Sequence, residues 1–256
     1  MSGLNVVLVP CLKDNYVFLA HDRAQGATAV IDPAEVEPVL RAAQAKGWKI
    51  SHILNTHHHA DHVGGNLELK RATGAVIVGP AADRDRIPGI DLAVGDGQRV
   101  TLGASVATAM FVPGHTRGHF AYWFAEAKTL FCGDTLFALG CGRLFEGTAE
   151  QMWTSLERLR RLPDDTRVYC AHEYTQGNAR FALSIEPYNP ALISRARRID
   201  EQRAAGEPTV PTTIGEERAT NPFLRADDPV LAAAVGLPAA PPAAVFAEVR
   251  RRKDVF

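Results

Sequence analysis

The sequence predicts an α/β protein whose layers of mixed sheets are followed by a smaller helical domain. Short runs of β-branched and aromatic residues, bounded by turn residues, dominate the first two thirds of the chain. Helical patterns lie between these runs, as expected of layered sheets and helices. After about residue 172 only helical patterns separated by proline-rich breaks remain. We therefore predict a sheet-based domain over residues 1–172 and a helical domain over residues 173–256.

Nine segments carry the strand pattern, and none of them follows His172. They are Asn5–Val9, Tyr16–Ala20, Thr28–Ile31, Ile50–Leu54, Ala75–Val78, Ser105–Phe111, Phe120–Phe124, Thr129–Cys132 and Arg167–Cys170. Apolar residues at helical spacing predict helices in both domains. The predicted helices are Val36–Ala45, Gly65–Thr73, Glu150–Leu162, Thr175–Ser184, Ala191–Ala205, Pro229–Val235 and Ala243–Arg251.

Composition excludes several classes of partner. The formal net charge of -1 gives no global field that would attract nucleic acid or an acidic membrane surface. No apolar run approaches the roughly 20 residues that cross a bilayer. The four cysteines lack CxxC spacing, so we expect reduced thiols in a cytoplasmic enzyme with no nucleic-acid or membrane partner.

A dense histidine motif follows the predicted strand Ile50–Leu54. Four of the nine histidines fall within the six residues from His57 to His62. Because alternate residues of an extended segment point the same way, His57 and His59 can bind one ion while His58 points elsewhere. Asp61 and His62, where the loop turns into a helix, can face a second ion. Such a cluster has no ordinary stabilising purpose, because unpaired imidazoles and a carboxylate are costly to bury.

Three further candidate ligands also follow strand-like runs. They are His115 in a Pro-Gly-His segment, Asp134 in Cys-Gly-Asp, and His172 at the end of the last predicted strand. A lone histidine after a strand is usually a polar loop residue, but four such strand ends suggest loops that converge at one sheet edge. Imidazole and carboxylate ligands suit zinc, iron or manganese.

The pattern resembles the metallo-β-lactamase superfamily and, within it, the glyoxalase II family, the hydroxyacylglutathione hydrolases. The resemblance covers almost the whole chain. Its motifs lie at Lys13–Tyr16, Thr56–His62, Pro113–His119, Phe131–Phe137, Gly140–Thr148, His172–Thr175, Asn221–Arg225 and Arg251–Asp254. The His57–His62 motif is specific only to the superfamily, whereas the Gly140–Thr148 block and the closing Lys-Asp segment narrow the match to the family.

The resemblance implies a four-layer αβ/βα sandwich followed by a helical C-terminal domain, and two divalent ions per chain, with zinc expected first and iron or manganese as alternatives. It assigns His57, His59 and His115 to one ion. Asp61, His62 and His172 would bind the other, and Asp134 would bridge. Asp61 and Asp134 would act in catalysis with a metal-bound hydroxide, since metal binding lowers the pKa of water to about 7. Asp32 is expected to support the ligand loop, and His119 either does the same or makes a simple loop hydrogen bond.

The implied reaction is hydrolysis of S-(2-hydroxyacyl)glutathione, S-D-lactoylglutathione first, to glutathione and D-lactate, the second step of methylglyoxal detoxification. The enzyme is expected to be a monomer. The resemblance nominates four residues as contacts to the glutathione thioester: Arg143, Tyr174, Arg250 and Lys253. Better-known members have lysine in place of Arg143 and tyrosine in place of Phe145, so one hydroxyl contact, typically about 1 kcal/mol, is lost here. No covalent role is expected for Cys141, whose flanking glycines indicate a tight loop.

Other functions of the same superfamily remain open at this point. They are a lactamase or lactonase, a persulfide dioxygenase with one iron, and an RNA-processing nuclease. A complete second ligand set argues against the dioxygenase, and the net charge of -1 argues against the nuclease. A non-catalytic metal-binding or redox-sensing module would need neither two metals nor a cationic substrate site. Metal content separates these alternatives.

Overall fold

The computed structural model describes residues 3–256, which divide into two compact units. Unit 1 contains the described residues up to Phe111 together with Gly118–Gly133, and unit 2 contains Val112–Arg117 and Asp134–Phe256. This division by internal contacts does not test the predicted boundary between residues 172 and 173, which stays a prediction. Met1 and Ser2 lie outside the described residues.

Unit 1 is built on a six-stranded mixed sheet in the order β1-β2-β3-β4-β5-β6. The first three strands pair antiparallel, and β3 to β6 pair parallel. The strands are β1 (Leu4–Cys11), β2 (Asn15–Asp22), β3 (Thr28–Ile31), β4 (Ile50–Leu54), β5 (Val76–Pro80) and β6 (Leu92–Val94). The mixed pairing confirms the predicted sheet type.

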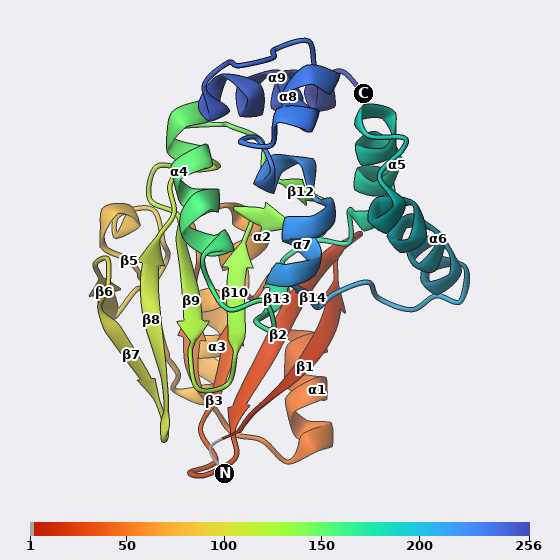
Figure 1. The fold of residues 1–256 in the computed structure, drawn as a ribbon. Coiled ribbons are helices and arrows are strands. Elements are labelled where there is room, and N and C mark those ends of the chain that lie inside the picture. The colour runs from red at the N-terminus through yellow and green to blue at the C-terminus, as the bar shows by residue number, and fades with distance from the viewer. Residues whose placement is uncertain (1–2) are drawn as a thin grey trace. The chain divides into compact units, whose positions relative to one another are not determined.

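Helices connect the parallel strands and cover the sheet (Figure 1). They are α1 (Glu37–Lys46), α2 (Ala60–Val63), α3 (Asn66–Thr73) and the 3-10 turn η1 (Ala81–Asp83). Val39 of α1 and Leu69 of α3 are fully buried in one apolar cluster with Ile53 of β4. Burying such side chains contributes about 1.5–3 kcal/mol each, which holds β4 and the loop after it in a rigid setting.

Unit 1 also contains an antiparallel meander, β7 (Arg99–Leu102), β8 (Ser105–Phe111), β9 (Phe120–Phe124) and β10 (Thr129–Gly133). Neighbours in sequence pair with each other. Phe124 and Phe131 meet edge to face with ring centroids 6.0 Å apart. This packing is typical of the aromatic-rich strand pattern in the sequence.

Unit 2 is mainly helical, as predicted for the later part of the chain. Its helices are α4 (Ala149–Arg160), α5 (Thr175–Ile185), α6 (Pro190–Ala204), α7 (Ile214–Thr220), η2 (Pro222–Leu224), α8 (Pro229–Ala234) and α9 (Pro242–Asp254). Helix α5 packs along α6, and α4 packs against α9 (Figure 1). None of the helices in residues 3–256 is long and apolar enough to cross a membrane.

Short strands complete unit 2 and correct one prediction. They are β11 (Leu136–Phe137), β12 (Gly140–Cys141), β13 (Arg167–Cys170) and β14 (Thr212–Thr213). The expectation of no strand after His172 is wrong, because β14 pairs antiparallel with β13. Two residues after a proline carry no period-2 pattern, so only the pairing itself identifies this strand.

Candidate metal centre and substrate cavity

In unit 1 the loop that carries the histidine motif is held by Asp32, the residue after β3. Asp32 Oδ1 accepts a hydrogen bond from the Thr56 backbone N–H at 2.7 Å, and Asp32 Oδ2 accepts one from Thr56 Oγ1 at 2.7 Å. All three groups are buried. The predicted support of the ligand loop by Asp32 is therefore confirmed.

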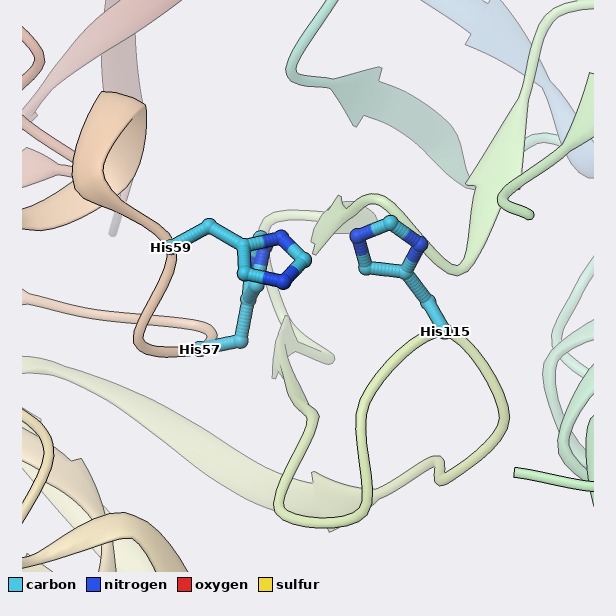
Figure 2. A group of neighbouring side chains, drawn as sticks. All are labelled: His57, His59 and His115. Atoms are coloured by element: carbon cyan, nitrogen blue, oxygen red, sulfur yellow. The ribbon is translucent and has the colours of Figure 1, made fainter. Parts of the chain in front are cut away.

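The same contacts fix the orientation of His57. The Thr56 hydroxyl donates to Asp32, so its oxygen accepts from His57 Nδ1, 3.0 Å away. This arrangement leaves the lone pair on His57 Nε2, which faces His59 Nδ1 at 3.0 Å. Figure 2 shows the two rings close together on one loop. A metal-binding histidine is ordinarily oriented in this way through its other nitrogen.

The ring nitrogens of His58 face partners other than those of His57 and His59, as the alternation in the sequence predicted, although the His58 ring contacts His59 edge-on at a centroid distance of 4.9 Å. Its Nδ1 lies 3.2 Å from Asp83 Oδ2, and Arg86 Nη1 donates to its Nε2 at 3.2 Å. His119 stacks on His57 at a centroid distance of 4.6 Å. The contact agrees with the supporting role that we considered for His119.

Asp61 and His62 form the second part of the motif. His62 Nδ1 lies 3.1 Å from Asp32 Oδ2, while its Nε2 faces Asp61 Oδ2 at 3.5 Å. Asn15 Nδ2 donates to Asp61 Oδ2 at 3.0 Å and so orients that carboxylate. Asp32 thus orients His57, through the Thr56 hydroxyl, and faces His62 directly.

Unit 2 contains the other three predicted ligands in buried positions. His115 Nε2 lies 3.5 Å from Asp134 Oδ2, and His172 Nε2 lies 3.4 Å from Asp134 Oδ1. His115, also drawn in Figure 2, donates from Nδ1 to the Arg143 carbonyl at 2.9 Å, which leaves Nε2 with its lone pair. A Cβ at position 142 would lie 2.0 Å from the Asp134 carbonyl oxygen, so only glycine fits there.

These nitrogen-to-oxygen distances fit two ligand atoms bound to one metal ion better than they fit direct hydrogen bonds. Charge-assisted N–H···O contacts are about 2.7–2.9 Å long. Two atoms that each lie about 2.0–2.1 Å from a tetrahedral zinc are about 3.3–3.4 Å apart. The nitrogen-to-oxygen distances of 3.4–3.5 Å at Asp134, and of 3.5 Å between Asp61 and His62, match the second value. The two units therefore each carry a His/Asp cluster of metal-binding type.

A cavity of about 780 Å³ in unit 2 is lined by His115 and Asp134. The four predicted substrate contacts, Arg143, Tyr174, Arg250 and Lys253, all line it as well. Tyr174 stacks on His172 with centroids 4.7 Å apart and ring planes 4° apart. The exposed ring of Phe145 also lines the cavity, and it offers no hydroxyl there.

Cys141 lines the cavity, but its surroundings do not favour the thiolate form that a nucleophile needs. Burial raises the pKa of its thiol to about 11, and the nearby Arg250 guanidinium only partly offsets this rise. The thiol is therefore neutral at pH 7, and a neutral thiol is a poor nucleophile. This agrees with the expectation that Cys141 has no covalent role.

The cations around the cavity differ in their contacts with the rest of the protein. Arg250 donates to the Cys141 carbonyl at 3.0 Å and forms an ion pair with Asp254 at 2.8 Å. Burial lowers the pKa of Lys253 most, and the positive charges of Arg250, Arg180 and Arg143 lower it further. The structure thus places all four predicted contacts at one cavity, while their contact with substrate stays a prediction.

Two polar residues of this region were missed by the sequence analysis. Asn221 opens one of the quoted motifs, yet no role was assigned to it. Its Nδ2 donates to the carbonyls of Phe137 at 3.2 Å and Gly140 at 3.0 Å, so it holds both strands of the β11–β12 hairpin. Arg180, which lines the cavity from α5, has the sequence pattern of any exposed helical arginine, and nothing in the sequence distinguishes it.

Family models match both parts of the chain. Residues 14–172 match the metallo-beta-lactamase superfamily, and residues 173–256 match the hydroxyacylglutathione hydrolase C-terminus. The hydroxyacylglutathione hydrolase of Methylococcus capsulatus is 61% identical over 253 residues, 99% of each chain. That of Rhodospirillum rubrum is 57% identical over the full length of both chains.

Solved structures agree on the fold. ETHE1 from Myxococcus xanthus is 25% identical with a TM-score of 0.65, covering 98% of each chain. TTHA1623, solved in a di-iron-bound form, is 26% identical with a TM-score of 0.60, covering 86% of this chain and 99% of its own. The predicted fold class is confirmed. By its sequence over the whole length and by its fold, the chain belongs to the hydroxyacylglutathione hydrolase family of the metallo-beta-lactamase superfamily.

Proposed function

We propose that this enzyme hydrolyses S-(2-hydroxyacyl)glutathione, with S-D-lactoylglutathione as the preferred substrate, to glutathione and D-lactate. The observation that carries the proposal is the cavity in which His115 and Asp134 share a wall with the cationic side chains of Arg143 and Lys253. Glutathione brings two carboxylates, so a site that cleaves its thioesters needs positive charge held at a fixed distance from the reacting carbonyl. The family membership supports the same substrate class.

We further propose that seven side chains hold two divalent ions, with zinc first and iron or manganese as alternatives. They are His57, His59, Asp61, His62, His115, Asp134 and His172. When bound, such ions lower the pKa of water and polarise a carbonyl oxygen. The di-iron form of TTHA1623 supports iron as an alternative.

The chain's own residues prepare the site in three ways. Asp32 and the Arg143 carbonyl set the tautomers of His57 and His115, so that Nε2 of each keeps a lone pair. The Tyr174 ring, stacked on His172, shields that imidazole and limits its rotation. No side-chain nucleophile is required, and the thiolate that leaves is a weak base that needs no strong general acid.

The test is an assay of metal-loaded enzyme on three substrates. S-D-lactoylglutathione should turn over, while a nitrocefin-type lactam and glutathione persulfide should not. Metal analysis should give two ions per chain. Comparable rates on the lactam, or one iron per chain with persulfide oxidation, would overturn the substrate assignment.

We also propose that the enzyme is a cytoplasmic monomer. The four cysteines are all buried and none forms a disulfide, which suits a reducing compartment. Light scattering coupled to size exclusion should give the mass of one 27.7 kDa chain. A dimer mass at micromolar concentration would contradict the monomer.

A further inference from the structure

Three cationic side chains line the cavity of unit 2 without an acidic partner. They come from three separate segments: Arg143 from the loop after β12, Arg180 from α5 and Lys253 from α9. Within residues 3–256, none of the three forms an ion pair. Lys253 also lies over the Phe181 and Phe256 rings, but among residues 3–256 no ion pair neutralises the positive charge of these three side chains.

The three acidic residues of the same cavity already face other partners, and Asp134 lies between His115 and His172. Asp254 binds Arg250 at 2.8 Å. Glu173 accepts hydrogen bonds from the backbone N–H and the hydroxyl of Thr209, at 2.8 and 2.6 Å. Among residues 3–256, none of these carboxylates forms an ion pair with Arg143, Arg180 or Lys253, so an anion from outside can pair with these three cations.

Holding these charges together is unfavourable until an anion arrives. Arg143 and Arg180 are close enough to Lys253 for their charges to lower its pKa, in addition to the effect of burial. Like charges gathered at one partly desolvated cavity repel each other, and a bound carboxylate removes that repulsion. Of the three, only Arg143 and Lys253 were expected from the family resemblance.

We propose that Arg180 is a further substrate-binding residue, which takes a carboxylate of the glutathione peptide beside Arg143 and Lys253. The inference rests on the proposed function and names a residue of the same site. Arg180 is exposed at the cavity wall, so its planar guanidinium can meet a carboxylate through two parallel hydrogen bonds. Arg250, whose guanidinium is engaged by Asp254 and the Cys141 carbonyl, is less available for this task.

The test compares Arg180→Gln with Arg197→Gln, which removes the same charge from an exposed site on α6 outside the cavity. With S-D-lactoylglutathione, Arg180→Gln should raise KM about tenfold, the equivalent of one charge-assisted hydrogen bond, and leave kcat within about twofold. Arg180→Lys should recover part of the loss. Arg197→Gln should leave KM unchanged.

Two substrate analogues identify the interaction. In one, the glycine carboxylate is an amide; in the other, the α-carboxylate of the γ-glutamyl residue is absent. The KM penalty of Arg180→Gln should disappear with one analogue, because the carboxylate that Arg180 binds is then missing. A penalty that persists with both analogues, or that Arg197→Gln reproduces, would overturn the proposal, as would no penalty at all.

A binding measurement separates this inference from the proposed function. Calorimetry with S-hexylglutathione, a thioether that cannot be hydrolysed, should show about tenfold weaker binding to Arg180→Gln than to the unsubstituted enzyme. Equal affinities would contradict the role of Arg180 even if the thioesterase activity is confirmed. Weaker binding without any thioester turnover would instead contradict only the proposed reaction.

Discussion

The polar side chains in the ligand loop of unit 1 are hydrogen-bonded within the protein, whereas several cations in the cavity of unit 2 have no acidic partner among the described residues. Around His57 and His62 the described contacts are internal: Asp32 binds Thr56, Thr56 binds His57, and Asn15 binds Asp61. In the cavity, Arg143 and Lys253 have no acidic partner of their own among residues 3–256. One region is arranged in advance, and the other is completed by what it binds.

The difference indicates where chemistry and recognition are located. Groups that must stand at fixed positions are held by short hydrogen bonds to buried residues, because small displacements are costly in catalysis. Arg143 and Lys253, which we expect to recognise a charged substrate, are left without an ion pair among the described residues, because a pre-existing ion pair would have to be broken on binding. Substitutions of the proposed metal ligands and their supports, Asp134 of the cavity wall included, should therefore affect metal content and kcat, and those of the unpaired cations of the cavity should affect KM.

The largest effect is expected from Asp134→Ala. Asp134 presents one oxygen to His115 and the other to His172, so its loss removes the group that both imidazoles face. We expect kcat to fall more than about a hundredfold and the metal content to fall. This loss should exceed the roughly 10- to 100-fold loss that follows when a residue that only orients a metal ligand is removed. Asp85→Ala, an exposed control, should change neither. Full metal content with near-normal kcat would remove Asp134 from the site.

Asp32→Asn should have the next largest effect, on metal retention. Asparagine tolerates the positive φ of 51° at this position, so the fold should persist. The lost charge should weaken metal binding about 10- to 100-fold. Metal remaining after dialysis against a chelator measures the loss, and excess metal should restore kcat. Retention equal to that of the unsubstituted protein would show that Asp32 serves only the backbone of the loop.

Lys253→Ala should raise KM about tenfold while kcat stays within about twofold, because the lysine binds substrate and does not take part in bond breaking. Arg251→Ala is a matched control on the same helix, where Arg251 is exposed and bound to Glu248. Its KM should not change. Should kcat fall with KM unchanged in Lys253→Ala, the division between the two regions would be wrong.

The smallest effect concerns pH. Burial first, and then the neighbouring arginines, lower the pKa of Lys253 below its ordinary 10.5. As pH rises through this lowered pKa, the free enzyme loses the charge that binds substrate, so KM should rise a few-fold at a pH below about 10.5. In Lys253→Arg the charge persists and KM should stay level over the same window. Parallel profiles in both proteins would assign the rise to another group.

The stability of the fold should also depend on the protonation of Lys253, but it should increase with pH over the range in which substrate binding weakens. A lysine with a lowered pKa binds fewer protons in the folded state than in the unfolded state. The stability of the ligand-free protein therefore increases as pH rises from the lowered pKa towards 10.5. Denaturant titrations over this pH range should show the free energy of unfolding of the unsubstituted protein increasing relative to that of Lys253→Met.

The sequence predicted the elements with strong periodicity and much of the site. The strands Thr28–Ile31, Ser105–Phe111 and Phe120–Phe124 have the predicted bounds, because each is rich in apolar residues in a continuous or alternating pattern. The spacing of His57, His58 and His59 predicted which ring would point away. These features depend on local geometry, which the chain encodes over a few residues.

Other features depend on partners distant in sequence. β6 was missed because it is only three residues long, and β7 because only two of its four residues, Val100 and Leu102, are apolar. Helix α7 was missed because Gly215 lowers its helical pattern, although the Thr213 hydroxyl caps it by accepting from the Glu216 N–H. Arg180 became a candidate only once its place at the cavity was known.

The hairpin held by Asn221 has a consequence for how the enzyme should fail. Its backbone carbonyls at Phe137 and Gly140 are bound by a side chain some eighty residues later in the chain, so the position of Arg143 just beyond it depends on a helical segment staying folded. Local opening of that segment, of the kind detected by amide hydrogen exchange, would release the hairpin before the sheet of unit 1 unfolds. On mild warming, substrate affinity and the orientation of His115, which the Arg143 carbonyl sets, should then be lost together, and the loss should reverse on cooling.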